Sequence, residues 1–324
     1  MKGYGVMCLI IGMLSSPVLG MTAPSAVFFL RPEDTRNVQV SFAGSLFGQH
    51  GDMTYAIQGP QDGGWKSELE WPIKNMVYGG GVISTAFGDR FSLNVGGWKS
   101  LTKNSGTMTD RDWFDDLRAL FLAIYDDDTA IFGEFDTTFD AVKFDGNLRF
   151  EFLRRAPLTL GVMAGYAYTQ FYWETGDGYQ HSPLPSYNIG AVTGAGITYK
   201  QRISTPYLGL SVSLIPEAVS TTLNLYAVYS PIAKCTDLDD HLARQKENTG
   251  STSGNFLSLG SDIHLRVNSS WGVTATVNYA TYDLEGSQDQ VFYGGTNAGT
   301  RFYNIDMTVT GSQLSLGFLA SYNF

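Results

Sequence analysis

The sequence predicts an all-β protein, a transmembrane antiparallel β-barrel of ten strands that extends above the membrane on the extracellular side. Three observations support this prediction. Apolar and polar residues alternate with a period of two, which places them on opposite faces of strands. Aromatic residues make up 14% of the chain and charged residues only 16%, so a large ring surface has to be buried or face lipid. Short and long connections also alternate, as in outer-membrane barrels.

Residues 1–20 have the features of a secretory signal. Lys2 precedes an apolar run from Val6 to Leu14, and small residues lead up to Gly20. That run is about half of the roughly 20 residues that a transmembrane helix needs. We therefore expect 1–20 to be removed and 21–324 to fold as a single barrel domain, since no linker or composition break divides it. Cys235 is then a lone cysteine and a free thiol.

The last predicted strand shows the alternation best. One face of 302–324 is apolar, and Leu319 alone breaks the pattern: Leu314, Leu316, Phe318, Ala320, Tyr322 and Phe324. The run 191–215 is interpreted as one strand that passes Pro206 without turning, because these barrels have an even number of strands. The ten predicted strands are 36–48, 66–87, 91–104, 131–152, 157–174, 191–215, 219–234, 255–267, 271–284 and 302–324.

A soluble β-sandwich also alternates, so further features have to decide between the two folds. The polar faces carry charges of both signs that can pair inside a lumen, and aromatic residues gather at strand ends. Short connections are predicted at 88–90, 215–218 and 268–270, and long ones near 104–130, 174–190, 235–254 and 285–300. Outer-membrane barrels place short turns in the periplasm and long loops outside. The sequence therefore predicts the outer membrane of a Gram-negative bacterium, with lipid around the barrel.

The formal net charge of −10 limits the partners. An acidic protein is a poor ligand for nucleic acid and favours cationic substrates. We expect a monomer, no metal and no cofactor.

Two acidic motifs lie on the predicted extracellular side. Asp110 and Asp112 are two positions apart and share a face if the segment is extended. Two close carboxylates raise each other's proton affinity, which suits general acid–base chemistry, although a solvated acidic loop or a calcium site gives the same pattern. In the second motif, Asp237, Asp239 and His241 alternate likewise, and a carboxylate beside an imidazole favours a base; a structural Asp–His contact is the alternative. At one barrel rim, the two pairs would form a groove with a water between them.

Strand parity tests this arrangement. Even-numbered residues such as Ser92 and Asn94 face the lumen in 91–104, and the same count places Asp110 and Asp112 inside. The strand before the second motif points its odd-numbered residues outward, so Asp239 faces the lumen only if one residue is inserted. Pro231 is the predicted position of this bulge.

The chain resembles the omptin family, outer-membrane proteases with a narrow ten-stranded barrel and a groove at its outer rim. The resemblance covers nearly all of 21–324 and is carried by 66–71 (KSELEW), 97–98 (GW), 108–113 (MTDRDW), 161–166 (GVMAGY), 199–202 (YKQR), 206–210 (PYLGL) and 237–241 (DLDDH). It implies that Asp110 and Asp112 are the family's aspartate couple and that Asp239 and His241 are its Asp–His dyad. These residues would activate a water that attacks the peptide carbonyl without an acyl-enzyme.

The resemblance also implies that the cationic substrates are peptides or proteins, and it implies substrate- and lipid-binding residues. Asp52 and Asp237 match the two acids that bind an Arg or Lys beside the scissile bond, and Met108 matches a substrate-binding position. Tyr166 and Arg202 match part of a lipopolysaccharide site, whereas Tyr168 and Gln170 replace its acid and arginine, which places a lipopolysaccharide requirement in question. Two other readings are a catalytically silent barrel that acts as an adhesin or scaffold, and a diffusion porin. Side chains largely fill the lumen of a ten-stranded barrel, which disfavours the porin.

Overall fold

The computed structural model describes residues 38–59, 64–114, 120, 129–184, 189–216 and 220–324. The predicted signal at 1–20 lies outside these residues. Their strands are β1 (Val38–Gln58), β2 (Trp65–Phe87), β3 (Phe91–Ser100), β4 (Asn104–Phe114), β5 (Ile131–Arg155), β6 (Leu158–His181), β7 (Gly190–Val192), β8 (Ile197–Leu214), β9 (Thr221–His241), β10 (Lys246–Arg266), β11 (Trp271–Phe292) and β12 (Arg301–Asn323). Two short 3-10 turns, η2 (Leu242–Arg244) and η3 (Gly295–Asn297), lie between strands. No helix among the described residues is long and apolar enough to cross a membrane.

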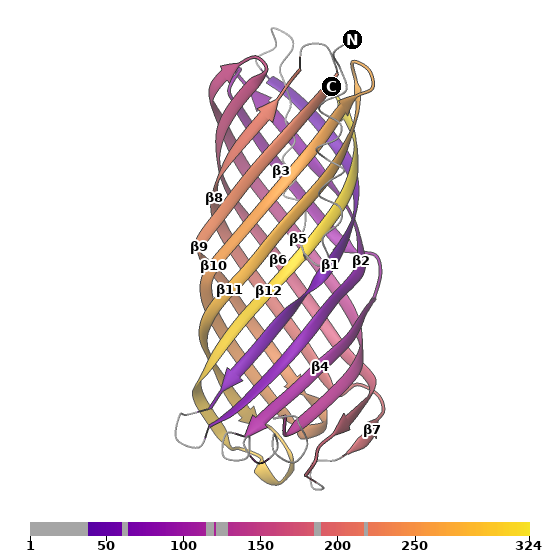
Figure 1. Cartoon of the computed structure of the whole chain (residues 1–324), viewed down its shortest axis with the longest axis vertical. Coiled ribbons are helices and arrows are strands. Elements are labelled where there is room, and N and C mark those ends of the chain that lie inside the picture. Colours follow the sequence, from indigo (N-terminus) through magenta and orange to yellow (C-terminus); the bar gives the residue numbers. More distant parts are fainter. Residues whose placement is uncertain (1–37, 60–63, 115–119, 121–128, 185–188, 217–219) are drawn as a thin grey trace.

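The strands close into a ring of ten. β1 pairs with both β2 and β12, and antiparallel ladders link every later neighbour through β5, β6, β8, β9, β10 and β11. β3 and β4 both lie between β2 and β5, so they form one interrupted strand. β7 adds only a three-residue ladder to β6. Figure 1 shows the result as a tall cylinder of steeply tilted strands, with β4 and β7 at one end and the C-terminus at the other. The predicted ten-stranded barrel is confirmed.

Several strands are longer than predicted at the end where β4 lies. β1 continues to Gln58 rather than residue 48, β9 reaches His241, and β11 reaches Phe292. The predicted long connections at 104–130, 174–190, 235–254 and 285–300 are therefore wrong in part, because each of them contains strand. The apolar outer face ends where the barrel leaves lipid, so the sequence alternation fades although the backbone ladder continues.

The outer face of β10 shows this change directly. Leu257, Leu259 and Ile263 point outward and are exposed, as expected of a lipid-facing band. In the part of β10 that precedes Asn255, the outward positions are the polar residues Glu247, Thr249, Ser251 and Ser253. The part of the barrel that projects from the membrane is the part that carries the two acidic motifs.

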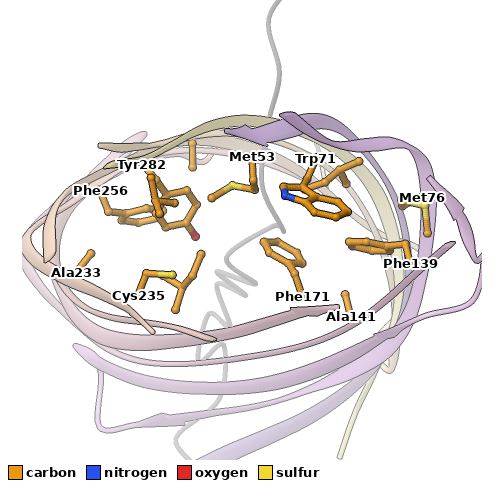
Figure 2. Close-up of a cluster of buried hydrophobic side chains, with 14 of the residues drawn as sticks. Met53, Trp71, Met76, Phe139, Ala141, Phe171, Ala233, Cys235, Phe256 and Tyr282 are labelled. Carbon is orange, nitrogen blue, oxygen red and sulfur yellow. The ribbon is translucent and has the colours of Figure 1, made fainter. Parts of the chain in front are cut away.

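Aromatic side chains fill the lumen below these motifs. Trp71, Trp173 and Tyr199 stack with ring centroids 5.2–5.8 Å apart, and all three are fully buried. Figure 2 shows Trp71, Phe139 and Phe171 directed into the barrel interior from different strands. In the register of the sheet, Trp71 lies two residues from Leu69, which pairs with Asp110, and Tyr199 pairs with Asp239. These aromatic side chains therefore fill the lumen below the acidic motifs, which disfavours a diffusion pore.

Candidate functional site

Asp110 and Asp112 enter the site from β4. Between the pairs Lys99–Val142 and Asp110–Gly133, the interrupted strand advances eleven positions while β5 advances nine. The interrupted strand therefore contains two more residues than β5 over this stretch. Because side chains alternate with a period of two, an insertion of two residues leaves the same face of the strand pointing inward. Asp110 is buried, as the simple count from β3 predicts, and Asp112 is partly buried. The inward orientation of Asp110 is confirmed.

The predicted bulge in β9 is also confirmed. Between the pairs Ser230–Phe256 and Ala233–Gly254, β9 advances three positions while β10 advances two. Pro231 and Ile232 are both exposed, which marks the inserted residue. Even-numbered residues face the lumen before this bulge and odd-numbered residues face it afterwards. Asp237, Asp239 and His241 therefore point inward.

The Asp–His pair has a defined hydrogen-bond geometry. His241 Nε2 lies 2.9 Å from Asp239 Oδ2, and the Asn248 amide Nδ2 donates to the same oxygen at 2.7 Å. Burial acts to raise the pKa of Asp239, but His241, Lys246 and Asn248 outweigh it, and the pKa is lowered. Burial also lowers the pKa of His241, although Asp239 opposes this shift. At neutral pH the pair consists of an ionised carboxylate and a neutral imidazole, which is the state of a general base.

Both acidic motifs reach one cavity of about 440 Å³. Asp112 lines it from β4, and Asp239 and His241 line it from β9. Asp110, Asp237 and Met108 are not part of its lining and are buried, at 4%, 5% and 0% exposure. The structure thus brings together three of the four predicted catalytic residues around one space, and Asp110 lies two positions from Asp112 on β4.

Asp110 is the more deeply buried member of the Asp–Asp pair. Burial and the nearby charge of Asp112 raise its pKa to about 7, while Arg244 and Lys246 act in the opposite direction. Charges on β4 and on the η2–β10 segment therefore influence each other, although they lie on opposite sides of the cavity. A carboxyl that titrates near neutrality can hold or release a proton during a reaction.

Asp237 lies beneath the cavity. Its Oδ2 accepts a hydrogen bond from the Tyr199 hydroxyl at 2.9 Å, and burial raises its pKa to about 7. Gly250 faces it across the β9–β10 ladder, where a Cβ would lie 2.1 Å from Asp237 Oδ1 and 2.5 Å from the Met307 sulfur. Only glycine leaves room for the carboxylate at this position.

Asp52 does not lie beside Asp237, contrary to the prediction. In β1 the odd-numbered residues face the lumen throughout, and Met53 is fully buried there. Asp52 lies on the outer face, where its electrostatic neighbours are Glu70, Lys74 and His50. The register shift at this level is an extra residue in β2, not in β1, so it does not turn Asp52 inward.

Three further site residues escaped the sequence prediction. Asn248, Lys246 and Arg244 line the cavity. They lie in the segment 235–254, which was predicted to be a loop, so no strand parity was applied to them. The even-numbered inward face of β10, visible from Ser258 onward, is the signal that would have identified Lys246 and Asn248.

The predicted lipopolysaccharide residues lie on the outer face. Tyr166 of β6 is 50% exposed and lies opposite Pro206 of β8. Arg202 of β8 is also exposed, but it lies four positions from Pro206 and is opposite Gln170. This position suits contact with a lipid headgroup, and their role stays a prediction. Among the described residues, no group of three His, Cys, Asp or Glu side chains is arranged to hold a metal ion.

The sequence and fold were compared with those of known proteins. The model of the Omptin family matches residues 34–318. The plasminogen activator of Yersinia pestis is 30% identical over 282 residues, which cover 82% of this chain and 85% of that protein. The outer membrane protease OmpP of Escherichia coli K12 is 28% identical and covers 72% of each chain. The crystal structure of the outer membrane protease OmpT from Escherichia coli superposes with a TM-score of 0.74 at 21% identity, covering 93% of this chain and all of that one.

Proposed function

Because the chain belongs to the omptin family and is an outer-membrane endopeptidase, we propose that it cleaves peptide bonds next to Arg or Lys by direct attack of a water molecule. Asp239 and His241 activate this water, and Asp110 and Asp112 face them. The observation that carries the proposal is the shared cavity, which Asp112, Asp239 and His241 line together.

The proposed reaction follows from the hydrogen bonds. His241 donates its Nε2–H to Asp239, so its Nδ1 carries the lone pair that takes a proton from the water. The hydroxide attacks the carbonyl carbon, and the couple of Asp110 and Asp112 holds a shared proton close to the developing oxyanion. The imidazolium then returns its proton to the leaving amine as the C–N bond breaks. No covalent acyl-enzyme forms.

The proposed preference for basic residues rests on Asp237. A carboxylate in a recessed position binds an ammonium or guanidinium through charge-assisted hydrogen bonds. The Asp52 side chain lies on the outer face of β1, so we do not assign it the role of a second carboxylate in such a site. We expect the preference for Arg or Lys over a neutral residue to depend on Asp237 alone, supported by the net negative charge of the chain.

The proposed orientation places the cavity at the cell exterior. The short turns at 88–90 and 267–270 and the C-terminus lie at the other end of the cylinder, which is the periplasmic end in barrels of this kind (Figure 1). Lipopolysaccharide would contact Tyr166 and Arg202 on the outer face, just beyond the apolar band. The same assay, with and without lipopolysaccharide, tests this requirement.

The deciding experiment uses quenched fluorescent peptides that contain Arg-Arg, Lys-Lys or Gln-Gln. We expect purified protein to cleave the basic peptides, and Asp110→Ala and His241→Ala to reduce kcat by at least about 100-fold. Asp240→Ala is the matched control. Asp240 adjoins the dyad in sequence, but its carboxylate accepts a hydrogen bond from the Tyr293 hydroxyl on the exposed side. Cleavage by Asp110→Ala or His241→Ala at the wild-type rate would show that the mechanism is wrong.

A further inference from the structure

Asn248 stands directly across the sheet from the dyad carboxylate. The register of β9 and β10 pairs Asn248 with Asp239, and the register of β10 and β11 pairs it with Gln290. Its side chain is 1% exposed and borders the cavity. Asn248 therefore occupies a fixed place in the wall of the site rather than a loop position.

Asn248 and His241 converge on one atom. The Asn248 Nδ2–H and the His241 Nε2 both lie within 3 Å of Asp239 Oδ2, at 2.7 and 2.9 Å. Two contacts from different strands restrict the rotation of the carboxylate, and the orientation of the carboxylate in turn sets the orientation of the imidazole. The Asn248 amide thus acts on His241 through Asp239.

The remaining polar atoms of Asn248 indicate what determines its position. Among the described residues, the Asn248 Oδ1 has no hydrogen-bond partner although it is buried. The hydrogen bond that the Asn248 side chain makes within the protein is the one that its amide donates to Asp239. This contact links the position of Asn248 to the dyad.

We propose that Asn248 is a positioning residue of the peptidase site, which holds Asp239 so that the imidazole of His241 presents its free nitrogen to the cavity. The inference rests on the proposed function, since it assigns a role within that reaction. Its proposed action is on Asp239 and not on the reacting atoms. It adds a third member, supplied by β10, to the pair that β9 supplies.

The test replaces the amide by a side chain of similar size that has no donor. Asn248→Leu should lower kcat about 10- to 100-fold, which is the range measured for residues that orient another ligand or base, with KM changed less than about twofold. Asn248→Gln, which keeps the carboxamide, should recover part of the activity. Thr252→Val is the matched control, because Thr252 is buried on the same inward face of β10, two positions beyond Gly250, and should leave kcat unchanged.

A second readout does not depend on cleavage. The tautomer and pKa of His241 can be followed by nitrogen NMR of the imidazole in detergent micelles, with the His241→Asn variant used to assign its signals. In Asn248→Leu, the charge of Asp239 is no longer shared with the amide, so the pKa of His241 should rise and the acid limb of the rate profile should move to higher pH.

The outcomes separate the two claims. If the wild type cleaves and His241→Ala does not, but Asn248→Leu keeps the wild-type kcat and acid limb, the role of Asn248 is refuted and the proposed function stands. An equal loss in Asn248→Leu and Thr252→Val also refutes it, because that loss is structural. If the wild type cleaves no basic peptide, the proposed function fails, and an unchanged His241 tautomer and pKa in Asn248→Leu then refutes the positioning role independently.

Discussion

Asp112 of β4 and His241 of β9 line the same cavity, although β5, β6 and β8 separate their strands in the ring. The two residues are far apart in sequence and lie on strands that are not hydrogen-bonded to each other. Only closure of the barrel brings them together, so the site exists in the closed ring and in no smaller part of the chain. Its proposed chemistry therefore depends on barrel geometry at specific positions.

The bulge in β9 offers a direct test of this geometry. Deletion of Ile232 removes the inserted residue of the bulge. Because Leu225 and Tyr229 face lipid and keep the first part of β9 in its orientation, the side chains beyond the bulge should exchange their inward and outward faces. We expect the barrel to assemble, as judged by its heat-modifiable mobility on gels, but peptidase activity to fall by more than about 1000-fold, as expected when both members of a catalytic dyad leave the site. Pro231→Ala, which keeps the residue count, should remain active. Wild-type activity in the deletion variant would contradict the role of the bulge.

The activity should have a bell-shaped dependence on pH. His241 has a lowered pKa and has to be neutral to act as a base, so activity should rise with pH below its ordinary value of 6.5. Asp110 has a raised pKa of about 7, and loss of its proton, which we propose that it shares with Asp112, should reduce activity above that pH. Measurement of kcat/KM on an Arg-Arg peptide from pH 4.5 to 9 tests both limbs. A flat profile between pH 6 and 9 would disagree with the assignment of Asp110.

Replacement of Lys246 by Met should move both limbs in one direction. The Lys246 ammonium lowers the pKa of Asp110 and of His241. Its removal should therefore raise both pKa values and shift the whole profile to higher pH. Lys234→Met is the control, because Lys234 is exposed on the outer face of β9 and its loss should leave the profile in place. A shift to lower pH would show that Lys246 does not act on these groups.

Asp237 should make the stability of the barrel depend on pH. Its folded-state pKa is raised to about 7, above the value of about 3.9 in an unfolded chain. The contribution of the Asp237 carboxyl to stability is present below the unfolded pKa and is lost as the pH rises through about 7. Asp237→Asn removes this loss, so the variant should be more stable than the wild type at pH 8 by about 1–3 kcal/mol and similar to it at pH 4. Urea unfolding in micelles at both values measures the difference.

The same position should control the preference for basic residues. Asp237→Asn should reduce the ratio of kcat/KM for an Arg-containing peptide over a Gln-containing peptide by about 10- to 100-fold, the usual consequence of losing a buried charge-assisted contact. Asp52→Asn should leave this ratio unchanged, because Asp52 faces outward from β1. Equal losses in the two variants would show that Asp52 reaches the substrate and that the outward orientation is wrong.

Much of this arrangement was predictable from residues alone. Alternation in 302–324 and 255–267 revealed the faces of β12 and β10 because lipid on one side and a polar lumen on the other impose opposite chemistry. The parity count placed Asp110 inside, and the mismatch at Asp239 predicted an insertion near Pro231, which β9 contains. The predicted inward face of β4 is correct because the two additional residues between β3 and β4 leave the alternation of faces unchanged.

The same signal failed where both faces of a strand are polar. Beyond the membrane band, β10 carries Lys246 and Asn248 inward and Glu247 and Thr249 outward, so no hydrophobic period marks the strand. No alternation therefore marks the inward face of 246–248, and Asn248 was not predicted as a site residue. Asp52 was placed by resemblance, whereas the alternation of β1 turns it outward.

The sequence by itself determined the barrel, its inward and outward faces within the membrane band, and the two acidic motifs, because these depend on a chemical contrast that repeats every second residue. Tertiary structure alone decided which side chains meet across the lumen. That choice depends on the register between strands and on closure of the ring, which brings Asn248 to Asp239 and Asp112 to the cavity of His241 while it leaves Asp52 outside.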